Sequence, residues 1–428
     1  MMARGRDLLL RLYHPAYIAL AVAIVVGAFG VRVQNLDAAP YGDEAYYYFT
    51  AHGLSHFFDT ARYPVAGSAF PVMPLLYRPF THSLESARAF NALVGTLAVL
   101  LVILILRDLR VSRPFQLAGG LLVALNPVEV QYSALLFEDM IGATIALAAL
   151  WAYVRGRHGA AAALAAGAVL AKQYYAFFGI ALFVDHLVVR RRLYYEMFLA
   201  GAVVVGWVVV RFGILGAPLS YLLEGHAIQP LGLRSLEEAL GGWFLLPLVV
   251  AGAVLGPRLR PAAYMLVGFL GFLALWRNAQ SWYFCLPIAL SVLLAAYGAE
   301  MTWQRLRARP AAWAAAGVAA ALMAVTVGVF SLNTRSFVRG WHDHDLNLAA
   351  ARILAAPPPR LEMVGCFWAY QLYPFEDQGV AAAIPVTAWD NLKGDTALVC
   401  PEAPATPAGW RETYRAGTYA VATRGTAP

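Results

Sequence analysis

Residues 84–106 read LESARAFNALVGTLAVLLVILIL, and no charged residue follows Arg88 in this stretch. A run of this length and apolar character predicts a helix that crosses a lipid bilayer. Several similar runs follow, and the whole chain is 61% hydrophobic and only 13% charged, whereas soluble domains carry about 25% charged residues. The sequence therefore predicts an all-α polytopic membrane protein, because helices pair their own backbone groups in lipid.

The arginines indicate how this chain crosses the membrane. Half of the 32 basic residues fall in six short clusters beside gaps between apolar runs: Arg4/Arg6/Arg11, Arg107/Arg110/Arg113, Arg155/Arg157, Arg190/Arg191/Arg192, Arg258/Arg260 and Arg305/Arg307/Arg309. Cytoplasmic loops of membrane proteins gather positive charge in this way. We therefore expect a multi-pass protein of the cell membrane, with its amino terminus in the cytoplasm, and no nucleic-acid partner.

If every arginine cluster lies in the cytoplasm and the apolar runs between clusters cross the membrane, the sequence predicts about eleven crossings. The expected spans are 15–32, a retained signal anchor, then 84–106, 114–127, 138–154, 159–171, 173–189, 193–212, 241–256, 261–276, 282–298 and 311–330. An odd number of crossings places the carboxyl-terminal region outside the cytoplasm.

Residues 159–189 decide whether this topology holds. As one helix they would be about 46 Å long, well beyond the roughly 30 Å hydrocarbon core. We expect two short helices with Lys172 at their outer turn, which keeps the arginine clusters on one side. Short helices also predict a site recessed below the membrane surface. Lys172 is one of only two lysines in the chain, the other being Lys393.

The first external loop, 33–83, contains the densest polar chemistry beside the predicted membrane. Residues 40–48 read PYGDEAYYY, so Asp43 and Glu44 stand next to three tyrosines. From Asp43 to Phe58, aromatic residues recur at helical spacing, which predicts an amphipathic helix in the membrane interface. In such a helix the two acids would also suit the first turn, where they meet the helix dipole. Capping and chemistry both remain possible roles for them.

The composition changes near residue 331. We expect a transmembrane domain over 1–330 and a small extracytoplasmic α/β domain over 331–428. A helix is predicted near 345–355, and short strands are predicted at 361–366, 381–386, 397–400 and 419–422. Cys366 and Cys400 both fall in this domain, where they form either an external disulfide or two buried thiols.

Two histidine arrangements suggest a metal without defining a site. His52 and His56 are four residues apart in the interfacial helix, and His342-Asp343-His344-Asp345 follows the last span. Helical histidine pairs can share zinc, but neither arrangement has a third ligand at a diagnostic spacing. We expect no cofactor and no metal, with these residues forming solvated polar faces.

The order of several motifs resembles the integral-membrane glycosyltransferases of the GT-C class, in particular the protein O-mannosyltransferase and lipid A aminoarabinose transferase group. The matching stretches are Gly42-Asp43-Glu44 in the first loop, residues 84–93 opening the second span, residues 165–172 at the fifth helix end, Asn126-Pro127 followed by Glu138-Asp139, and residues 282–287. Together they extend over about three hundred residues. The resemblance implies a GT-C membrane fold and a sugar carried on polyprenyl phosphate.

The resemblance also implies roles for particular residues. Asp43 would be the general base toward an acceptor hydroxyl, and Glu44 its supporting acid or an acceptor ligand. The proposed phosphate-binding cations are Lys172, Arg88 and Arg277, which would stabilise the negative charge of the departing lipid. The proposed contacts to acceptor or sugar are Asp139, Glu138, Tyr46 and Tyr283. Helix capping, interface anchoring and an aromatic belt are the structural alternatives for these positions.

The sequence thus favours an extracytoplasmic glycosyltransferase that moves a hexose or pentose from a polyprenyl-monophosphate donor to an acceptor protein, lipid or glycan. A transporter or flippase of a lipid-linked substrate is the alternative from another class. Inverted repeats and charge pairs inside the membrane would favour the transporter, but the acids cluster at the outer helix ends and no half of the chain repeats the other.

Overall fold

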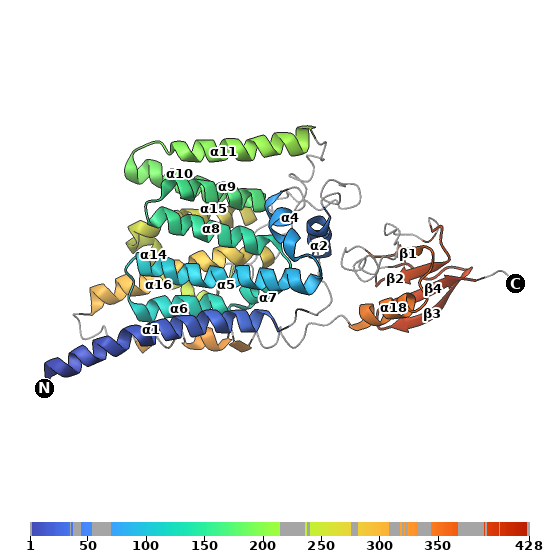
Figure 1. Ribbon diagram of the computed structural model, residues 1–428, viewed down its shortest axis with the longest axis horizontal. Coiled ribbons are helices and arrows are strands. Elements are labelled where there is room, and N and C mark those ends of the chain that lie inside the picture. Colours follow the sequence, from blue (N-terminus) through green and yellow to red (C-terminus); the bar gives the residue numbers. More distant parts are fainter. Residues whose placement is uncertain are drawn as a thin grey trace. The chain divides into compact units, whose positions relative to one another are not determined.

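The computed structural model of the protein describes residues 2–34, 36, 44–53, 70–214, 236–237, 240–274, 281–307, 317–318, 321, 324–329, 331–332, 344–366, 389, 392–401 and 403–425. The chain forms two compact units. One, here called the helical unit, comprises 1–36 and 69–339; the other, the carboxyl-terminal unit, comprises 37–68 and 340–428. Figure 1 shows the helices of the first unit and the small sheet of the second.

The helical unit is a bundle of apolar helices. Its helices are α1 (Met2–Arg32), α4 (Val72–Tyr77), α5 (Leu84–Asp108), α6 (Arg113–Leu125), α7 (Pro127–Ala134), α8 (Glu138–Val154), α9 (His158–Ala171), α10 (Ala176–Arg190), α11 (Tyr195–Val208), α14 (Leu246–Leu255), α15 (Arg260–Ala274) and α16 (Cys285–Leu306). Short 3-10 helices extend or join them, namely η2 (Arg78–Phe80), η3 (Gln173–Tyr175), η5 (Trp243–Leu245), η6 (Pro257–Leu259) and η7 (Ser281–Phe284), and a π-helix, η4 (Val209–Ile214), continues α11.

Helices α5, α8 and α16 form the buried centre of the bundle, and α1, α6, α9 and α14 pack around them. The start of α5 is fixed by a capping box, in which Ser83 and Ser86 each bond the other's backbone N–H through the side-chain oxygen. Helices α14 and α16 approach closely because Gly252 and Gly298 lie at their contact. A Cβ at Gly252 would be 1.9 Å from the carbonyl oxygen of Leu294, so only glycine permits this small-residue packing.

The helices alternate in direction, which gives the bundle two distinct ends (Figure 1). Helices α5, α8 and α16 begin, and α1, α6 and α9 end, at what we call the site end. At the opposite end, the basic end, α5, α8, α10 and α16 end and α15 begins. The described arginines of the predicted clusters near residues 110, 156, 191, 259 and 306 all fall at the basic end. This confirms that the clusters share one side of the bundle.

The described residues do not establish the predicted eleven crossings. Within them, four helices are long and apolar enough to cross a membrane: His14–Arg32, Leu84–Asp108, Tyr195–Gly213 and Cys285–Leu306. Two bent pairs also pass this test, Pro127–Ala134 with Glu138–Val154 and Trp243–Leu255 with Pro257–Phe272, while His158–Ala171 and Gln173–Val189 are shorter apolar helices. Most of the predicted span 311–330 lies outside the described residues.

Individual helix bounds agree with most of the sequence predictions. The break at Lys172 is confirmed, because α9 ends at Ala171 and η3 begins at Gln173. The first predicted span, 15–32, is confirmed by the apolar stretch His14–Arg32; helix α1 itself starts at Met2, because the basic amino-terminal residues continue the same helix. Helix α7 was not predicted, since its sequence is short and only weakly apolar.

The carboxyl-terminal unit contains α2 (Glu44–His52), α18 (His344–Leu354) and a four-stranded sheet of β1 (Leu361–Val364), β2 (Thr396–Val399), β3 (Trp410–Ala416) and β4 (Tyr419–Arg424). The strand order is β1-β2-β4-β3, with β1 parallel to β2 and the other pairs antiparallel. Apolar residues of α18 pack on the sheet, including Leu346 and Ile353 against Met363 and Leu398. This confirms a small α/β module.

Three details of this unit differ from the sequence prediction or complete it. Cys366 and Cys400 form a disulfide, which decides between the two alternatives left open for them. Strand β3 was missed because four of its residues face solvent and no apolar alternation marks it. The predicted helix 43–58 is observed over Glu44–His52; Asp43 and residues 54–58 lie outside the described residues.

Candidate active site

The break between α9 and α10 places Lys172 at the site end. Lys172 has an extended backbone, with φ −154° and ψ 127°, so the chain leaves the α9 helix at this residue. Its side chain is nevertheless buried, with only 6% of the residue exposed. An ammonium group in such a position needs partners, because an isolated buried charge is very costly.

Two acids at the start of α8 provide those partners. The Nζ of Lys172 donates a hydrogen bond to Oε1 of Glu138 and lies 3.9 Å from Oδ2 of Asp139. Both acids are fully buried, at 1% and 0% exposure. Two carboxylates and one ammonium give this cluster a net charge of −1 when all three are ionised. The sequence placed these residues in one site, but it did not predict that they pair with each other.

Two tyrosines that follow Lys172 hold Asp139. Tyr174 donates its hydroxyl hydrogen bond to Oδ1 of Asp139, and Tyr175 donates to the backbone carbonyl of the same residue at 2.7 Å. The ring of Tyr283, in η7, meets the ring of Tyr174 edge-on at a centroid distance of 5.3 Å. Tyr283 is half-buried. Its contact with Tyr174 brings this predicted site residue next to the cluster. We call Glu138, Asp139, Lys172, Tyr174 and Tyr175 the acid–lysine cluster.

Close packing keeps Tyr175 in place. A Cβ added at Gly142 of α8 would lie 2.2 Å from the Tyr175 ring, so the ring lies directly over this glycine. Sequence reasoning identified neither Gly142 nor the two tyrosines. The Gln173-Tyr174-Tyr175 turn after a helix-ending lysine is the pattern that could have suggested them.

Comparison with solved structures gives this arrangement a context. The structure is similar to that of ArnT from Cupriavidus metallidurans in the apo state, with a TM-score of 0.64, 16% identity, and 96% of this chain and 98% of that chain covered. It is also similar to the same protein bound to undecaprenyl phosphate, with a TM-score of 0.61, 17% identity and 96% and 97% coverage.

The chain has the fold of ArnT. An oligosaccharyltransferase from Archaeoglobus fulgidus, in complex with Zn and sulfate, is similar at a TM-score of 0.53 and 14% identity, with 90% of this chain and 68% of that chain covered. Both neighbours are GT-C glycosyltransferases, so the resemblance found in the sequence is confirmed for the fold. No protein-family model matches the sequence, and a comparison with curated proteins also finds no match.

Arg88 lies in a second polar layer of this ArnT-like bundle. It is completely buried in the second turn of α5 and donates a hydrogen bond to the carbonyl of Leu36 at 2.7 Å. One turn later, Asn91 accepts from the Tyr77 hydroxyl and donates to the carbonyls of Tyr132 and Leu135. This layer joins α4, α5 and α7 at the site end.

Arg32 and Glu129 are buried charges that sequence reasoning missed. Arg32 ends α1 and donates to the carbonyls of Ala28 and Ala124 at 3.0 and 3.1 Å, which ties α1 to the end of α6. Glu129 lies in α7 at 1% exposure. Arg32 marked only the end of an apolar run in the sequence, and Glu129 belongs to the helix that was not predicted.

The remaining predicted site residues are only partly described. Glu44 begins α2 and is fully buried. Tyr46 lies in the same helix, but its side chain is outside the described part of the structure, as are Asp43 and Arg277. Among the described residues, no group of three or more histidine, cysteine or acidic side chains could hold a metal ion. His56 and His342 are not among those residues.

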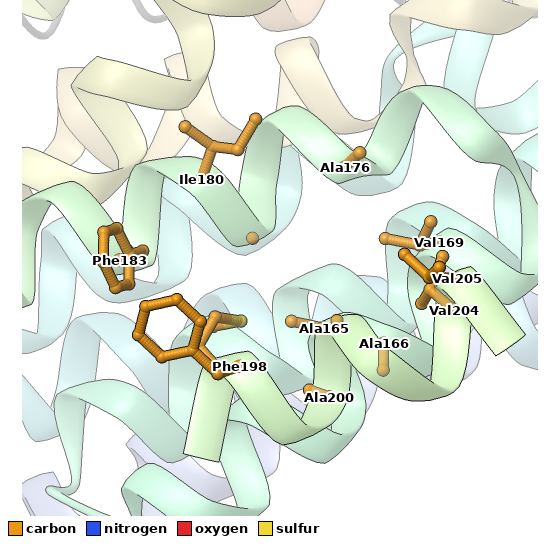
Figure 2. A pocket seen from close by; sticks show the side chains of 13 residues that line it. Ala165, Ala166, Val169, Ala176, Ile180, Phe183, Phe198, Ala200, Val204 and Val205 are labelled. Atoms are coloured by element: carbon orange, nitrogen blue, oxygen red, sulfur yellow. The ribbon is translucent and has the colours of Figure 1, made fainter. Parts of the chain in front are cut away.

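An apolar groove is formed by three helices of the helical unit. It has a volume of about 330 Å³ and runs between α9, α10 and α11 (Figure 2). Small residues form its walls, including Ala165 and Ala166 of α9 and Gly201 of α11, with Phe183 and Phe198 toward one end. The α9 wall reaches Val169, three residues before Lys172. The groove can therefore take a hydrocarbon chain.

Proposed function

We propose that this protein is a membrane glycosyltransferase that moves a sugar from a polyprenyl-phosphate carrier to an acceptor hydroxyl. The shared fold with ArnT carries the proposal, because it extends over almost the whole of both chains. One of the ArnT structures holds undecaprenyl phosphate, a lipid of the same class as the proposed donor. The acid–lysine cluster and the apolar groove supply the two environments, polar and hydrocarbon-like, that such a donor requires.

The groove between α9, α10 and α11 is the proposed place for the prenyl chain. Helix α11 supports this, because most of its side chains are exposed, including Leu199 at 72% and Phe198 at 58%. In a membrane, such a helix faces lipid. A prenyl chain could therefore enter the groove sideways from the bilayer, with its phosphate at the Lys172 end.

In the proposed reaction, Asp43 removes the proton from the acceptor hydroxyl, which attacks the anomeric carbon and displaces the prenyl phosphate with inversion. Lys172, with Arg88 and Arg277, would stabilise the departing phosphate. Glu138 and Asp139 would keep the buried ammonium in place and accept hydrogen bonds from sugar or acceptor hydroxyls. Glu44, Tyr46 and Tyr283 are proposed to line the acceptor and sugar positions.

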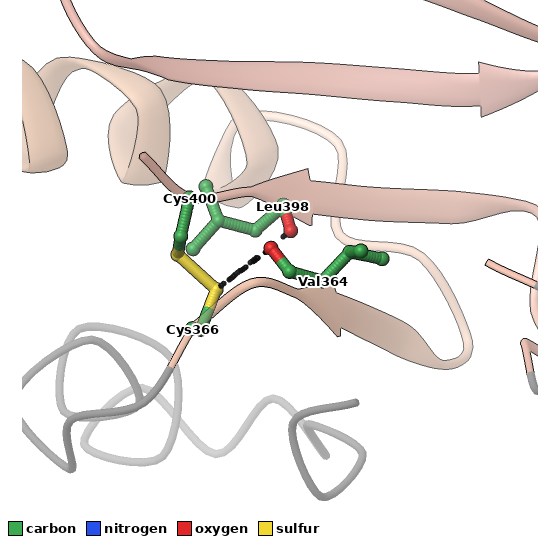
Figure 3. Close-up of a disulfide and its surroundings, with 4 residues drawn as sticks. All are labelled: Val364, Cys366, Leu398 and Cys400. Carbon is green, nitrogen blue, oxygen red and sulfur yellow. Dashed lines mark hydrogen bonds between the residues drawn. A yellow bond between two sulfur atoms is a disulfide. The ribbon is translucent and has the colours of Figure 1, made fainter. Parts of the chain in front are cut away.

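Two observations support transfer at the extracytoplasmic face. The arginine clusters gather at the basic end, and positive charge favours the cytoplasmic side. The carboxyl-terminal unit contains a disulfide, which forms in oxidising compartments. Figure 3 shows its two sulfur atoms joined just beyond the ends of the parallel strands β1 and β2. We infer that the site end and this unit face away from the cytoplasm.

The shared fold with two transferases favours the enzyme over the transporter or flippase that the sequence left open. The test is to incubate the purified protein with a panel of labelled polyprenyl-phosphate hexoses and pentoses and candidate acceptors. We expect transfer from at least one donor, with release of prenyl phosphate in equal amount. Transport of an intact lipid-linked sugar across vesicles, without release of prenyl phosphate, would overturn the proposal.

A further inference from the structure

A polar cavity lies at the basic end, away from the acid–lysine cluster. Its volume is about 320 Å³, and its polar lining residues are Asp108, Tyr153, Asp185, Arg258 and Arg260. These residues come from the ends of α5, α8 and α10, from η6 and from the first residue of α15. The proposed glycosyl transfer uses none of them, so the cavity calls for a separate explanation.

One side of the cavity is cationic. Arg258 lies in η6 and is exposed, while Arg260 begins the fifteen-residue helix α15 and is half-buried. Neither guanidinium has an ion-pair partner among the residues that the structure describes. The start of α15 adds the positive end of the helix dipole to the same side. Two unpaired guanidinium groups beside a cavity favour a phosphate, which arginine binds through paired N–H donors.

The other side of the cavity is anionic. Asp185 is 5% exposed, and its Oδ2 accepts a hydrogen bond from the Tyr153 hydroxyl at 2.8 Å. Asp108 accepts from the indole N–H of Trp151 at 2.8 Å and lies 3.5 Å from the Nε of Arg155, so its charge is partly balanced. Asp185 is the more buried of the two carboxylates, so water screens its charge less and it attracts a cation in the cavity more strongly.

The position of the cavity identifies the source of such a ligand. Ends of membrane-spanning helices lie near the lipid headgroups, and all the lining segments meet at helix ends. The apolar side chains Val154, Val189 and Pro257 complete the lining. A lipid whose headgroup carries both charges could place its phosphate on the arginines, its cation on Asp185 and its glycerol against these apolar residues.

We propose that this cavity binds the headgroup of a phospholipid that carries a phosphate and a primary ammonium, of the phosphatidylethanolamine type. A primary ammonium has three N–H donors for the carboxylates and the tyrosine hydroxyl. A choline headgroup has no such donor, and a glycerol headgroup has no positive charge. The cavity therefore selects phosphatidylethanolamine over phosphatidylcholine and phosphatidylglycerol.

The test uses the purified full chain, delipidated and then supplied with each of the three lipids, with bound lipid counted by native mass spectrometry. Wild type retains phosphatidylethanolamine best. The double variant Arg258→Gln/Arg260→Gln retains about tenfold less, because charge-assisted hydrogen bonds to the phosphate are lost. The matched control is Arg305→Gln, at the same end but outside the cavity, and it binds as wild type. Equal retention by the double variant and this control overturns the proposal.

A second variant tests the selectivity. Asp185→Asn keeps the side-chain shape but removes the charge, so phosphatidylethanolamine loses its advantage over phosphatidylglycerol. If this variant still prefers phosphatidylethanolamine over phosphatidylglycerol, Asp185 does not bind the ammonium of the headgroup. Soluble O-phosphoethanolamine at micromolar concentration does not displace the lipid, because it lacks the glycerol and acyl chains; displacement would show that the true ligand is a soluble phosphoryl amine. If Asp185→Asn does not fold, the arginine variants still test whether the cavity binds the phosphate of the lipid.

Discussion

The Nζ of Lys172 lies 3.9 Å from Oδ2 of Asp139, in a site where both residues are buried. With Glu138 as its second partner, the lysine joins the end of α9 to the start of α8. This pairing changes how the lysine can act on a phosphate. The phosphate would meet an ammonium that is already positioned and whose charge is balanced by two carboxylates, so Lys172 would orient the donor by hydrogen bonding rather than attract it by net charge.

Removing the lysine leaves two buried carboxylates without their cation. We expect Lys172→Met to lower the free energy of unfolding by about 3 kcal/mol, as for other broken buried ion pairs. The measurement is thermal unfolding of the detergent-solubilised protein. Lys393→Met is the matched control, because it removes the only other lysine, which is exposed in the carboxyl-terminal unit.

Adding Glu138→Gln to Lys172→Met should restore part of the lost stability, since it removes one of the two carboxylate charges that Lys172 had balanced. If the single and double variants unfold at the same temperature, the ion pair is not what stabilises this junction.

The packing of Tyr175 over Gly142 gives a prediction with an internal control. Gly142→Ala should destabilise the protein and reduce transfer, because its Cβ would meet the Tyr175 ring at 2.2 Å and displace a hydroxyl that bonds Asp139. Gly167→Ala, on the neighbouring helix α9, has its nearest contact at 3.6 Å. It should be neutral or stabilising by up to about 1 kcal/mol. Equal effects of both variants on melting temperature and turnover would argue against this role of Tyr175.

These comparisons also show what the sequence could and could not predict. Apolar runs and arginine clusters predicted most helix bounds and the break at Lys172, because both follow from the cost of polar groups in lipid. The cluster itself could not be predicted as a set of contacts. Nothing in the sequence singled out Tyr174 and Tyr175, and Arg32 marked only the end of an apolar run. Their roles depend on how α1, α6, α8 and α9 pack, which a single sequence does not specify.

The disulfide between Cys366 and Cys400 closes a loop with a sequence separation of 34 residues. Because a cross-link of this span lowers the entropy of the unfolded chain, it should stabilise the folded unit by about 4 kcal/mol. We expect Cys366→Ala/Cys400→Ala to make the carboxyl-terminal unit more sensitive to limited proteolysis, with little effect on the helical unit. Cys285→Ala, which removes the buried free cysteine of α16, controls for loss of a thiol. Unchanged protease resistance in the double variant would show that the sheet does not depend on the bridge.

The groove gives a prediction about the length of the donor. A Cβ at Gly201 or at Gly206 meets no atom within 4 Å, and both glycines lie on α11, but only Gly201 lines the groove. Gly201→Leu should raise the KM for long-chain prenyl donors about tenfold and change it little for short-chain analogues, because the new side chain fills space that only the long chain needs. Gly206→Leu should leave both KM values unchanged. A uniform rise in KM across chain lengths would show that the prenyl chain does not bind in this groove.

The most direct test of the central claim compares wild type with Asp43→Asn in transfer of label from the best polyprenyl-phosphate sugar, with Asp37→Asn in the same loop as control. Losing the general base should lower turnover by at least about 100-fold, while the variant stays folded and still binds the donor. The control should turn over as wild type. Near-normal turnover by folded Asp43→Asn, or absence of transfer by wild type from every polyprenyl-phosphate donor in the panel, would contradict the account.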